Sequence, residues 1–288
     1  MDNDLRKRGI AFAFFGMLGI STDSLFIRLA DVDGFDVTFW VGIFTAIVTF
    51  ATSVTVHKIS PVAGIREGGW PLWLAGALQA VSTSLFVIAV TLTSVSNVVV
   101  IVAAAPMFAA ALSALFLGER TSRRVWLAIA FVIVGVVVVV SGSFGAGSVA
   151  GDLLAIGAIF LFGCSLVLLR RFPDVNRTLM VGLGGIGMSL IAFVPATLFG
   201  HGSTTWIALV LMGALFGPLA RVLLAIAPRY LPAAEVGLFT PIETVAASVW
   251  AWLFFGEVPL GATYIGGVIV VAAVTWGMRQ PRRLRVTR

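Results

Sequence analysis

Long apolar runs follow one another along the whole chain, with only short polar stretches between them. Ten of these runs are close to the length, about 20 residues, that an α-helix needs to cross a bilayer. Because a lipid-facing backbone must satisfy its own hydrogen bonds, such long and uniform runs indicate helices and not barrel strands. The expected spans cover approximately residues 9–29, 37–56, 70–90, 95–117, 123–141, 151–170, 178–199, 205–228, 232–254 and 261–278.

Composition agrees with a protein embedded in a membrane. The chain is 59% apolar and 11% charged, whereas soluble domains are about half apolar and about a quarter charged. The N-terminal MDNDLRKR precedes a long apolar run without a small-residue cleavage site, so we expect a retained first helix. The single cysteine, Cys164, excludes an internal disulfide, and His57 and His201 have no ligand-like spacing. No metal and no cofactor are therefore expected.

The basic residues indicate how the chain is oriented. When the connections between spans are assigned alternately to the two sides, 17 of the 19 Lys and Arg fall on the side of both termini. The positive-inside rule makes that side cytoplasmic, as in a multi-pass protein of a bacterial-type inner membrane. The charge of +6 does not indicate nucleic-acid binding, because these residues lie between spans. They are Arg6, Lys7, Arg8, Lys58, Arg66, Arg120, Arg123, Arg124, Arg170, Arg171, Arg177, Arg229, Arg279, Arg282, Arg283, Arg285 and Arg288.

An internal repeat divides the chain into two halves. Residues 97–119 and 235–257 align without a gap at a spacing of 138 residues, and each stretch ends in Phe, an apolar residue, Gly and Glu. We predict a first half over 1–142 and a second half, with a basic cytoplasmic tail, over 143–288. Because each half holds five spans, an odd number, the second half enters the membrane upside down. The predicted fold is therefore an all-α integral membrane protein with ten transmembrane helices in two inverted five-helix repeats, an arrangement suited to alternating access.

The repeated stretches resemble the signatures of the drug/metabolite transporter superfamily, EamA type. Ala-Ala-Pro-Met-Phe-Ala-Ala-Ala-Leu at 104–112, followed by Phe-Leu-Gly-Glu-Arg, is similar to the first-half signature, and Thr240-Pro241-Ile242-Glu243 to the second. Thr244 stands where the family often has a proline. The resemblance covers essentially the whole chain and implies export of small organic metabolites, with amino acids first and the aromatic-amino-acid exporters as one candidate branch. The signature residues are Pro106, Gly118, Glu119, Pro241, Gly256 and Glu257.

Two ionisable residues inside spans are the first candidates for chemistry. Glu243 lies near the middle of the ninth span, where a carboxylate is costly and tends to face the bundle interior. It is a candidate proton site or partner of a substrate ammonium group, and the alternative is a structural hydrogen bond. Arg221 follows Pro218, at which the helix is expected to bend. Its planar guanidinium would neutralise Glu243 or hold a substrate carboxylate, and the alternative is snorkelling towards the cytoplasmic face.

Polar residues of two other spans are further candidates. Gln79, Ser82 and Thr83 in the third span would bind a polar substrate or, equally, join neighbouring helices. Asp23 in the first span is a candidate proton site or, with Arg28, an outer gate; the alternative is a hydrated charge near the interface.

The remaining candidates carry weaker signals. Trp40 would stack on a ligand or belong to the interfacial aromatic belt, and Asn97 and Ser165 are possible lining residues. Glu119 and Glu257 are interpreted as helix-end caps or contacts between the repeats.

These features favour a secondary transporter with a central cavity lined by spans 1, 3, 4, 6, 8 and 9. No G-x-x-x-x-G-K-[ST] motif is present, so ATP does not drive it within this chain. Protons, an exchanged solute or the substrate's own gradient would do so. The expected partners are a small-molecule substrate and membrane lipid, in a monomer or homodimer. An exporter of nucleobases, drugs or sugar derivatives is the alternative. A membrane-embedded lipid enzyme is a distant one, since no span carries paired carboxylates or histidines at metal spacing.

Overall fold

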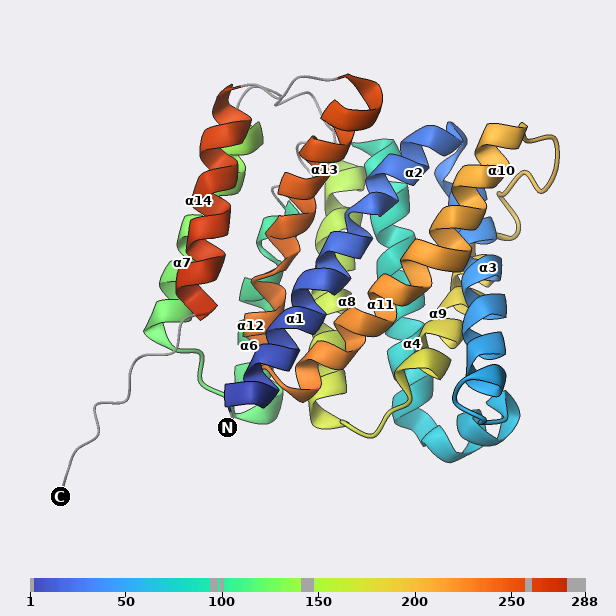
Figure 1. Cartoon of the computed structure of the whole chain (residues 1–288), viewed down its shortest axis with the longest axis horizontal. Coiled ribbons are helices and arrows are strands. Elements are labelled where there is room, and N and C mark those ends of the chain that lie inside the picture. The colour runs from blue at the N-terminus through green and yellow to red at the C-terminus, as the bar shows by residue number, and fades with distance from the viewer. Residues whose placement is uncertain (1–2, 94–97, 99–100, 141–147, 257–260, 279–288) are drawn as a thin grey trace.

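The structure, a computed structural model, describes residues 3–93, 98, 101–140, 148–256 and 261–278. The described residues form helices joined by short connections, with no strand among them (Figure 1). The first half contains α1 (Asn3–Ile20), α2 (Thr22–Ala30), α3 (Gly34–Thr55), α4 (Pro61–Leu92), α6 (Ala105–Leu117) and α7 (Arg123–Val140). The second contains α8 (Val149–Arg171), α9 (Arg177–Ala192), α10 (Ser203–Val210), the π-helix η1 (Leu211–Phe216), α11 (Gly217–Ile226), the 3₁₀ turn η2 (Ala227–Arg229), α12 (Ala233–Gly237), α13 (Thr240–Phe255) and α14 (Gly261–Met278).

The predicted all-α membrane fold is confirmed. Within the described residues, each of the ten expected spans coincides with a helix or with an interrupted helix. Six of these are long and apolar enough to cross a membrane by length and composition, and shorter apolar helices cover Ile101–Leu117, Arg177–Ala192 and Tyr264–Met278. The predicted division at residue 142 falls in 141–147, outside the described residues, and stays a prediction.

The two halves run in opposite directions through the bundle. Arg6, at the start of α1, donates to the Met278 carbonyl at the end of α14 (3.0 Å), which defines what we call the terminal end of the bundle. Asp152, at the start of α8, instead accepts from Thr93 beyond the end of α4 (2.7 Å), at the opposite end. The first helix of each half therefore begins at a different end, as an inverted repeat requires.

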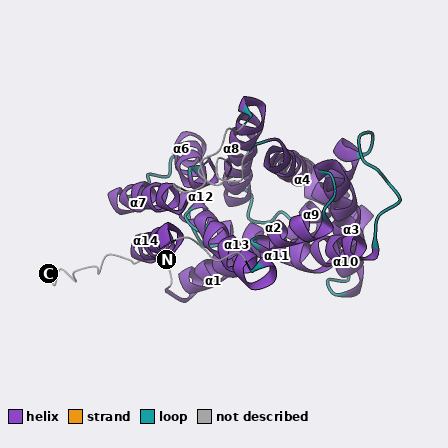
Figure 2. Ribbon diagram, turned by 90° about the horizontal axis from the view of Figure 1, so that it is seen from above, coloured by secondary structure: helices purple, strands orange, loops and turns teal. Residues whose placement is uncertain are grey.

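The helices pack side by side in one bundle. Figure 2 shows α7 and α14 at one edge and α3 and α10 at the other, with α11 and α13 between them. The main partners are α3 with α9, α4 with α8 and α9, α7 with α14, and α1 with α11.

Several spans are interrupted near their middle. A turn at Ser21 separates α1 from α2, and residues 238–239 separate α12 from α13. The Ser21 hydroxyl donates to the Leu18 carbonyl at the first of these breaks (2.6 Å). Prolines lie in the first turns of α6 and α13, where the missing N–H has no helical partner to lose. These breaks bring helix N-termini into the protein interior.

The bend expected at Pro218 takes another form. The chain stays helical through this proline, and the π-helix η1 directly precedes it. Thr45 of α3 donates to the Gly213 carbonyl within η1 (3.1 Å), which satisfies part of the widened turn. Single π-turns of this kind occur frequently at functional sites.

The glycine of each repeated Gly-Glu ending terminates a helix. Gly118 follows α6 with φ of 65°, and Gly256 follows α13 with φ of 67°. Both are in the left-handed conformation that favours glycine at helix C-termini. A Cβ at either position would meet nothing within 4 Å. Backbone conformation, and not lack of space, therefore accounts for the repeated glycine.

Candidate functional site

A cavity of about 140 Å³ lies between the two halves. Its walls come from α1, α2, α4, α6, α8, α11 and α13, which belong to the six spans named from the sequence, and α9 adds Met180. Most of the lining is apolar, including Phe86, Val87 and Phe162. The polar side chains on it are Asp23, Gln79, Ser82, Thr83, Ser165, Arg221, Thr240 and Glu243.

Asp23 and Arg221 form a buried ion pair across this cavity. Arg221 Nη2 donates to Asp23 Oδ2 at 2.8 Å, although the residues are 198 positions apart in the chain. The two side chains are only 9% and 6% exposed. Removing two charges from water is expensive, and mutual attraction offsets the penalty only when the remaining polar atoms are also satisfied. The pair is thus an unusual feature for a membrane interior.

Local backbone structure positions both members of this pair. Asp23 lies in the first turn of α2, directly after the break at Ser21, where the positive end of the helix dipole stabilises a carboxylate. Arg221 lies one turn beyond Gly217, at which η1 gives way to α11. A Cβ on Gly217 would lie 2.5 Å from Arg221 Nη1 and 2.5 Å from the Met212 carbonyl oxygen. Glycine therefore leaves the space that the guanidinium occupies.

Three polar atoms around the cavity have no partner. Asp23 Oδ1, Arg221 Nη1 and Gln79 Nε2 are buried and make no hydrogen bond within the described residues. Buried polar atoms are nearly always hydrogen-bonded, so each exception calls for an explanation. One of these atoms is an acceptor and two are donors. Together they match a small molecule that offers both an acidic and a basic group.

Glu243 lies on the same cavity. It is in the first turn of α13, just after the break at 238–239, so a helix N-terminus again supports a carboxylate. Thr240, at the start of this helix, also lines the cavity, although the sequence singled it out only as part of the family signature. From the sequence, Glu243 was one expected partner of Arg221. In the structure, Arg221 instead forms its ion pair with Asp23.

The polar cluster of α4 divides between two roles. Ser82 donates to the Ala158 carbonyl of α8 (2.8 Å), so it joins two helices while also lining the cavity. Gln79 and Thr83 lie on the cavity wall, and Ser165 faces it from α8. The helix-joining interpretation thus applies to Ser82, and substrate binding by this cluster stays a prediction.

Trp40 does not lie on the cavity. Its ring packs edge-on against Trp206 of α10, with a centroid distance of 4.7 Å, and stacks near Phe44. Its helix, α3, packs against α9 and α10 at one edge of the bundle, which turns this side chain away from the centre. Trp40 is thus absent from the lining of this cavity, and a role in ligand binding stays a prediction.

Arg28 does not pair with Asp23 as an outer gate. Its guanidinium lies over the Phe255 ring, 4.3 Å from the centroid, while Asp23 binds Arg221. Five residues rotate an α-helix by about 140° beyond a full turn, so positions 23 and 28 face different neighbours. Asn97 and Glu257, also candidates from the sequence, lie outside the described residues.

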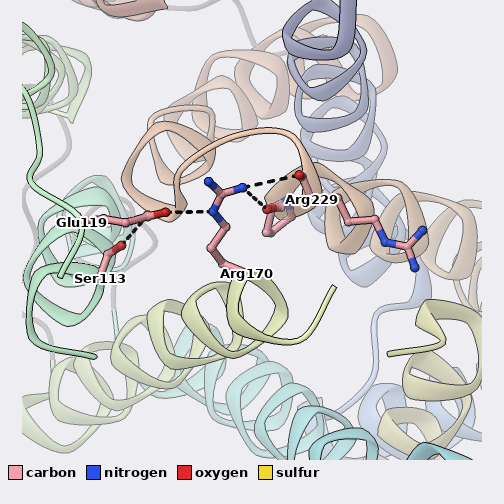
Figure 3. Close-up of polar contacts among 5 residues, drawn as sticks. Ser113, Glu119, Arg170 and Arg229 are labelled. Carbon is pink, nitrogen blue, oxygen red and sulfur yellow. Dashed lines mark hydrogen bonds and ion pairs between the residues drawn. The ribbon is translucent and has the colours of Figure 1, made fainter. Parts of the chain in front are cut away.

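A second polar network lies at the terminal end of the bundle (Figure 3). Arg170 Nε donates to Glu119 Oε1 at 3.0 Å, and its Nη1 donates to the carbonyls of Pro228 (3.1 Å) and Arg229 (3.4 Å). The Ser113 hydroxyl donates to the other Glu119 oxygen at 2.9 Å. Glu119 is thus a contact between residues of the two predicted halves.

Sequence reasoning missed the structural role of Arg177. It was counted only among the basic residues that orient the chain, but the structure buries it. Its guanidinium donates to the carbonyls of Leu169 (3.0 Å) and Phe172 (3.3 Å), and to those of Val175 and Ala225 (3.2 Å for Ala225). The end of α8 is thereby attached to the end of α11. No signal in the sequence separates this arginine from its exposed neighbours.

Comparison with known proteins places these features in context. The model of the EamA-like transporter family matches residues 7–141 and again residues 149–277. A riboflavin transporter from Rhizobium johnstonii is 26% identical over 287 residues, which cover 96% of this chain and 89% of that protein. The pseudopaline exporter of Pseudomonas aeruginosa is 28% identical over 234 residues, covering 77% and 80%. A crystal structure at 18% identity shares the fold, with a TM-score of 0.84 over 97% of this chain and 100% of that one.

Proposed function

Because the chain belongs to the EamA-like transporter family, we propose that it is a secondary transporter that exports a small zwitterionic metabolite, an amino acid, by alternating access. The observation that carries this proposal is the buried Asp23–Arg221 pair, whose two residues line the central cavity and in which each partner keeps one buried, unpartnered atom. A ligand that carries both charges satisfies both atoms at once. We propose a transporter and not a lipid enzyme.

The geometry suggests how a zwitterion would bind. Its carboxylate would accept hydrogen bonds from Arg221 Nη1 and Gln79 Nε2, because both donors are buried and unpartnered. Its ammonium group would donate to Asp23 Oδ1 and would also be attracted by Glu243 on the same wall. Charge-assisted hydrogen bonds of this kind are stronger than neutral ones.

The apolar part of the cavity indicates a neutral side chain on the substrate. Phe86, Val87 and Phe162 surround the polar atoms and would bury an aliphatic or aromatic group. Burial of apolar surface contributes about 25 cal/mol per Å². A neutral aliphatic or aromatic amino acid is therefore favoured over a charged one.

Glu243 is the proposed proton-coupling residue. With Asp23 and Arg221 both ionised, their charges cancel, so an ionised Glu243 leaves one net negative charge on the cavity wall. A proton neutralises that charge in the absence of substrate. The ammonium group of a bound zwitterion, placed beside Glu243, would favour release of that proton by local attraction, although the zwitterion itself has no net charge. Intramembrane carboxylates that face a cavity commonly serve as proton relays.

A neutral heteroaromatic substrate is the second candidate. The riboflavin transporter matched above aligns over nearly the whole chain, and the phenyl rings on the cavity wall would stack on a planar ring. Such a substrate offers no charged group to Asp23 or Arg221.

We further propose that the protein lies in a bacterial-type inner membrane, with both termini cytoplasmic as the basic residues indicate.

The test is uptake into proteoliposomes. The probes are radiolabelled leucine, phenylalanine, lysine and glutamate, with unlabelled riboflavin and uracil as competitors. We expect saturable flux of leucine or phenylalanine that Arg221→Gln abolishes. Arg66→Gln removes an exposed guanidinium near the start of α4, at a residue that does not line the cavity, so it serves as the matched control and keeps the flux. Saturable uptake of radiolabelled riboflavin without amino-acid flux would reject the zwitterion in favour of the second candidate.

A further inference from the structure

The network around Arg170 lies directly beyond one end of the central cavity. Leu169 of α8 and Ala225 of α11 line the cavity. Arg170 is the next residue after Leu169, and the carbonyls of Pro228 and Arg229 that it binds follow Ala225 within one turn. The network thus lies between the cavity and the terminal end of the bundle.

This network joins elements of the two predicted halves. Ser113 and Glu119 lie within and just after α6, whereas Arg170, Pro228 and Arg229 come from α8 and η2 (Figure 3). Arg177 already attaches the end of α8 to the end of α11 within the second half. The bond between Arg170 and Glu119 therefore connects this joined pair of helix ends to α6.

The strength of the Arg170–Glu119 contact suits an interaction that opens and closes. Its side chains are 26% and 30% exposed, so water reaches both charges. Ion pairs with access to water contribute little net stability, and water replaces them at small cost. When Glu119 moves away, Arg170 keeps its hydrogen bonds to the carbonyls of Pro228 and Arg229.

We propose that the Glu119–Arg170 ion pair is the gate at the terminal end of the cavity, and that it is closed in this structure. The inference rests on the proposed transport function, since a gate is needed only where the cavity must face both sides in turn. Separation of α6 from α8 at this contact opens the cavity towards the terminal end. A permanent contact between the repeats is the competing explanation.

Chemical accessibility tests the gate without knowledge of the substrate. Cys164 is the single cysteine of the chain, so Cys164→Ser combined with Ser165→Cys places one thiol on the cavity wall. A charged, membrane-impermeant methanethiosulfonate is added to the terminal side in oriented vesicles of the full-length protein. We expect Glu119→Gln and Arg170→Gln each to raise the labelling rate from that side about threefold, as loss of a weak ion pair implies.

Two further variants keep the result interpretable. Glu67→Gln removes an exposed carboxylate near the start of α4 and is the matched control, with unchanged labelling. Ser113→Ala removes one hydrogen bond to Glu119 with little risk to folding, and we expect a smaller rise. Unchanged labelling in Glu119→Gln, Arg170→Gln and Ser113→Ala would overturn the gate and identify a permanent contact.

The same vesicles separate this inference from the proposed substrate. Increased labelling in the network variants, together with no amino-acid flux in vesicles of the wild-type protein, retains the gate and rejects the amino acid as substrate. Amino-acid flux with unchanged labelling in all three network variants rejects the gate alone.

Discussion

The Asp23–Arg221 and Glu119–Arg170 ion pairs differ in how many of their polar atoms have hydrogen-bond partners. Arg221 and Asp23 are almost fully buried, yet each keeps an unpartnered polar atom. Arg170 and Glu119 are more exposed, but Arg170 also binds two carbonyls and Glu119 also binds Ser113. Since leaving a buried polar atom without a partner is expensive, the first pair is suited to a ligand and the second to a contact within the protein.

Removal of Arg221 has the largest expected effect. Arg221→Gln leaves Asp23 buried without its counter-charge, so we expect the free energy of unfolding to fall by about 3 to 5 kcal/mol and transport to be lost. Denaturant unfolding in detergent and proteoliposome uptake measure the two effects. The double variant Asp23→Asn/Arg221→Gln should recover most of the stability but no transport. If the double variant transports normally, the pair is structural only.

The second-largest expected effect is on the coupling of transport to a proton gradient. Glu243→Gln removes the proposed proton site while keeping the shape of the side chain. We expect amino-acid flux that no longer responds to an imposed proton gradient, measured in liposomes across a series of internal and external pH values. Glu67→Gln, outside the cavity, should keep the response of the wild type. An unaltered pH dependence in Glu243→Gln would exclude this carboxylate as the coupling site.

Gly217→Ala tests how the cavity pair is positioned. The added methyl group would lie 2.5 Å from Arg221 Nη1, so the guanidinium must move away from its position beside Asp23. We expect the KM for uptake to rise about tenfold, which corresponds to about 1.4 kcal/mol. The control is Gly202→Ala. Gly202 directly precedes α10 of the same span, and a Cβ there would meet nothing within 4 Å. This variant should leave the KM unchanged. Equal KM values for the two variants would mean that Gly217 does not position Arg221.

The smallest effect is expected at the terminal end. Glu119→Gln removes one charge of a partly exposed pair, and Arg170 retains its two carbonyl partners. We expect the free energy of unfolding to fall by no more than about 1 kcal/mol, measured as for Arg221→Gln. If the free energy of unfolding falls as much as in Arg221→Gln, the two ion pairs contribute equally to stability and the expected difference between them is wrong.

Much of this site was predictable because charge is rare inside a membrane. Asp23, Arg221 and Glu243 stand out in apolar spans, and all three lie on the cavity. The sequence left two roles open for Trp40, because an aromatic ring in an apolar span carries no sign of which neighbour it faces. Arg177 was overlooked for a related reason, since its buried carbonyl partners come from backbone that any sequence provides.

The sequence alone determined that the fold is built of apolar membrane helices in two repeats, because the length and apolarity of the runs respond directly to the bilayer. It also determined the helix-ending glycines, whose conformation is local. Only the tertiary structure decided that Arg221 binds Asp23 across 198 positions and that Arg170 reaches Glu119. A span that faces lipid on one side and packed helices on the other is apolar all round, so its periodicity does not reveal which side chains meet.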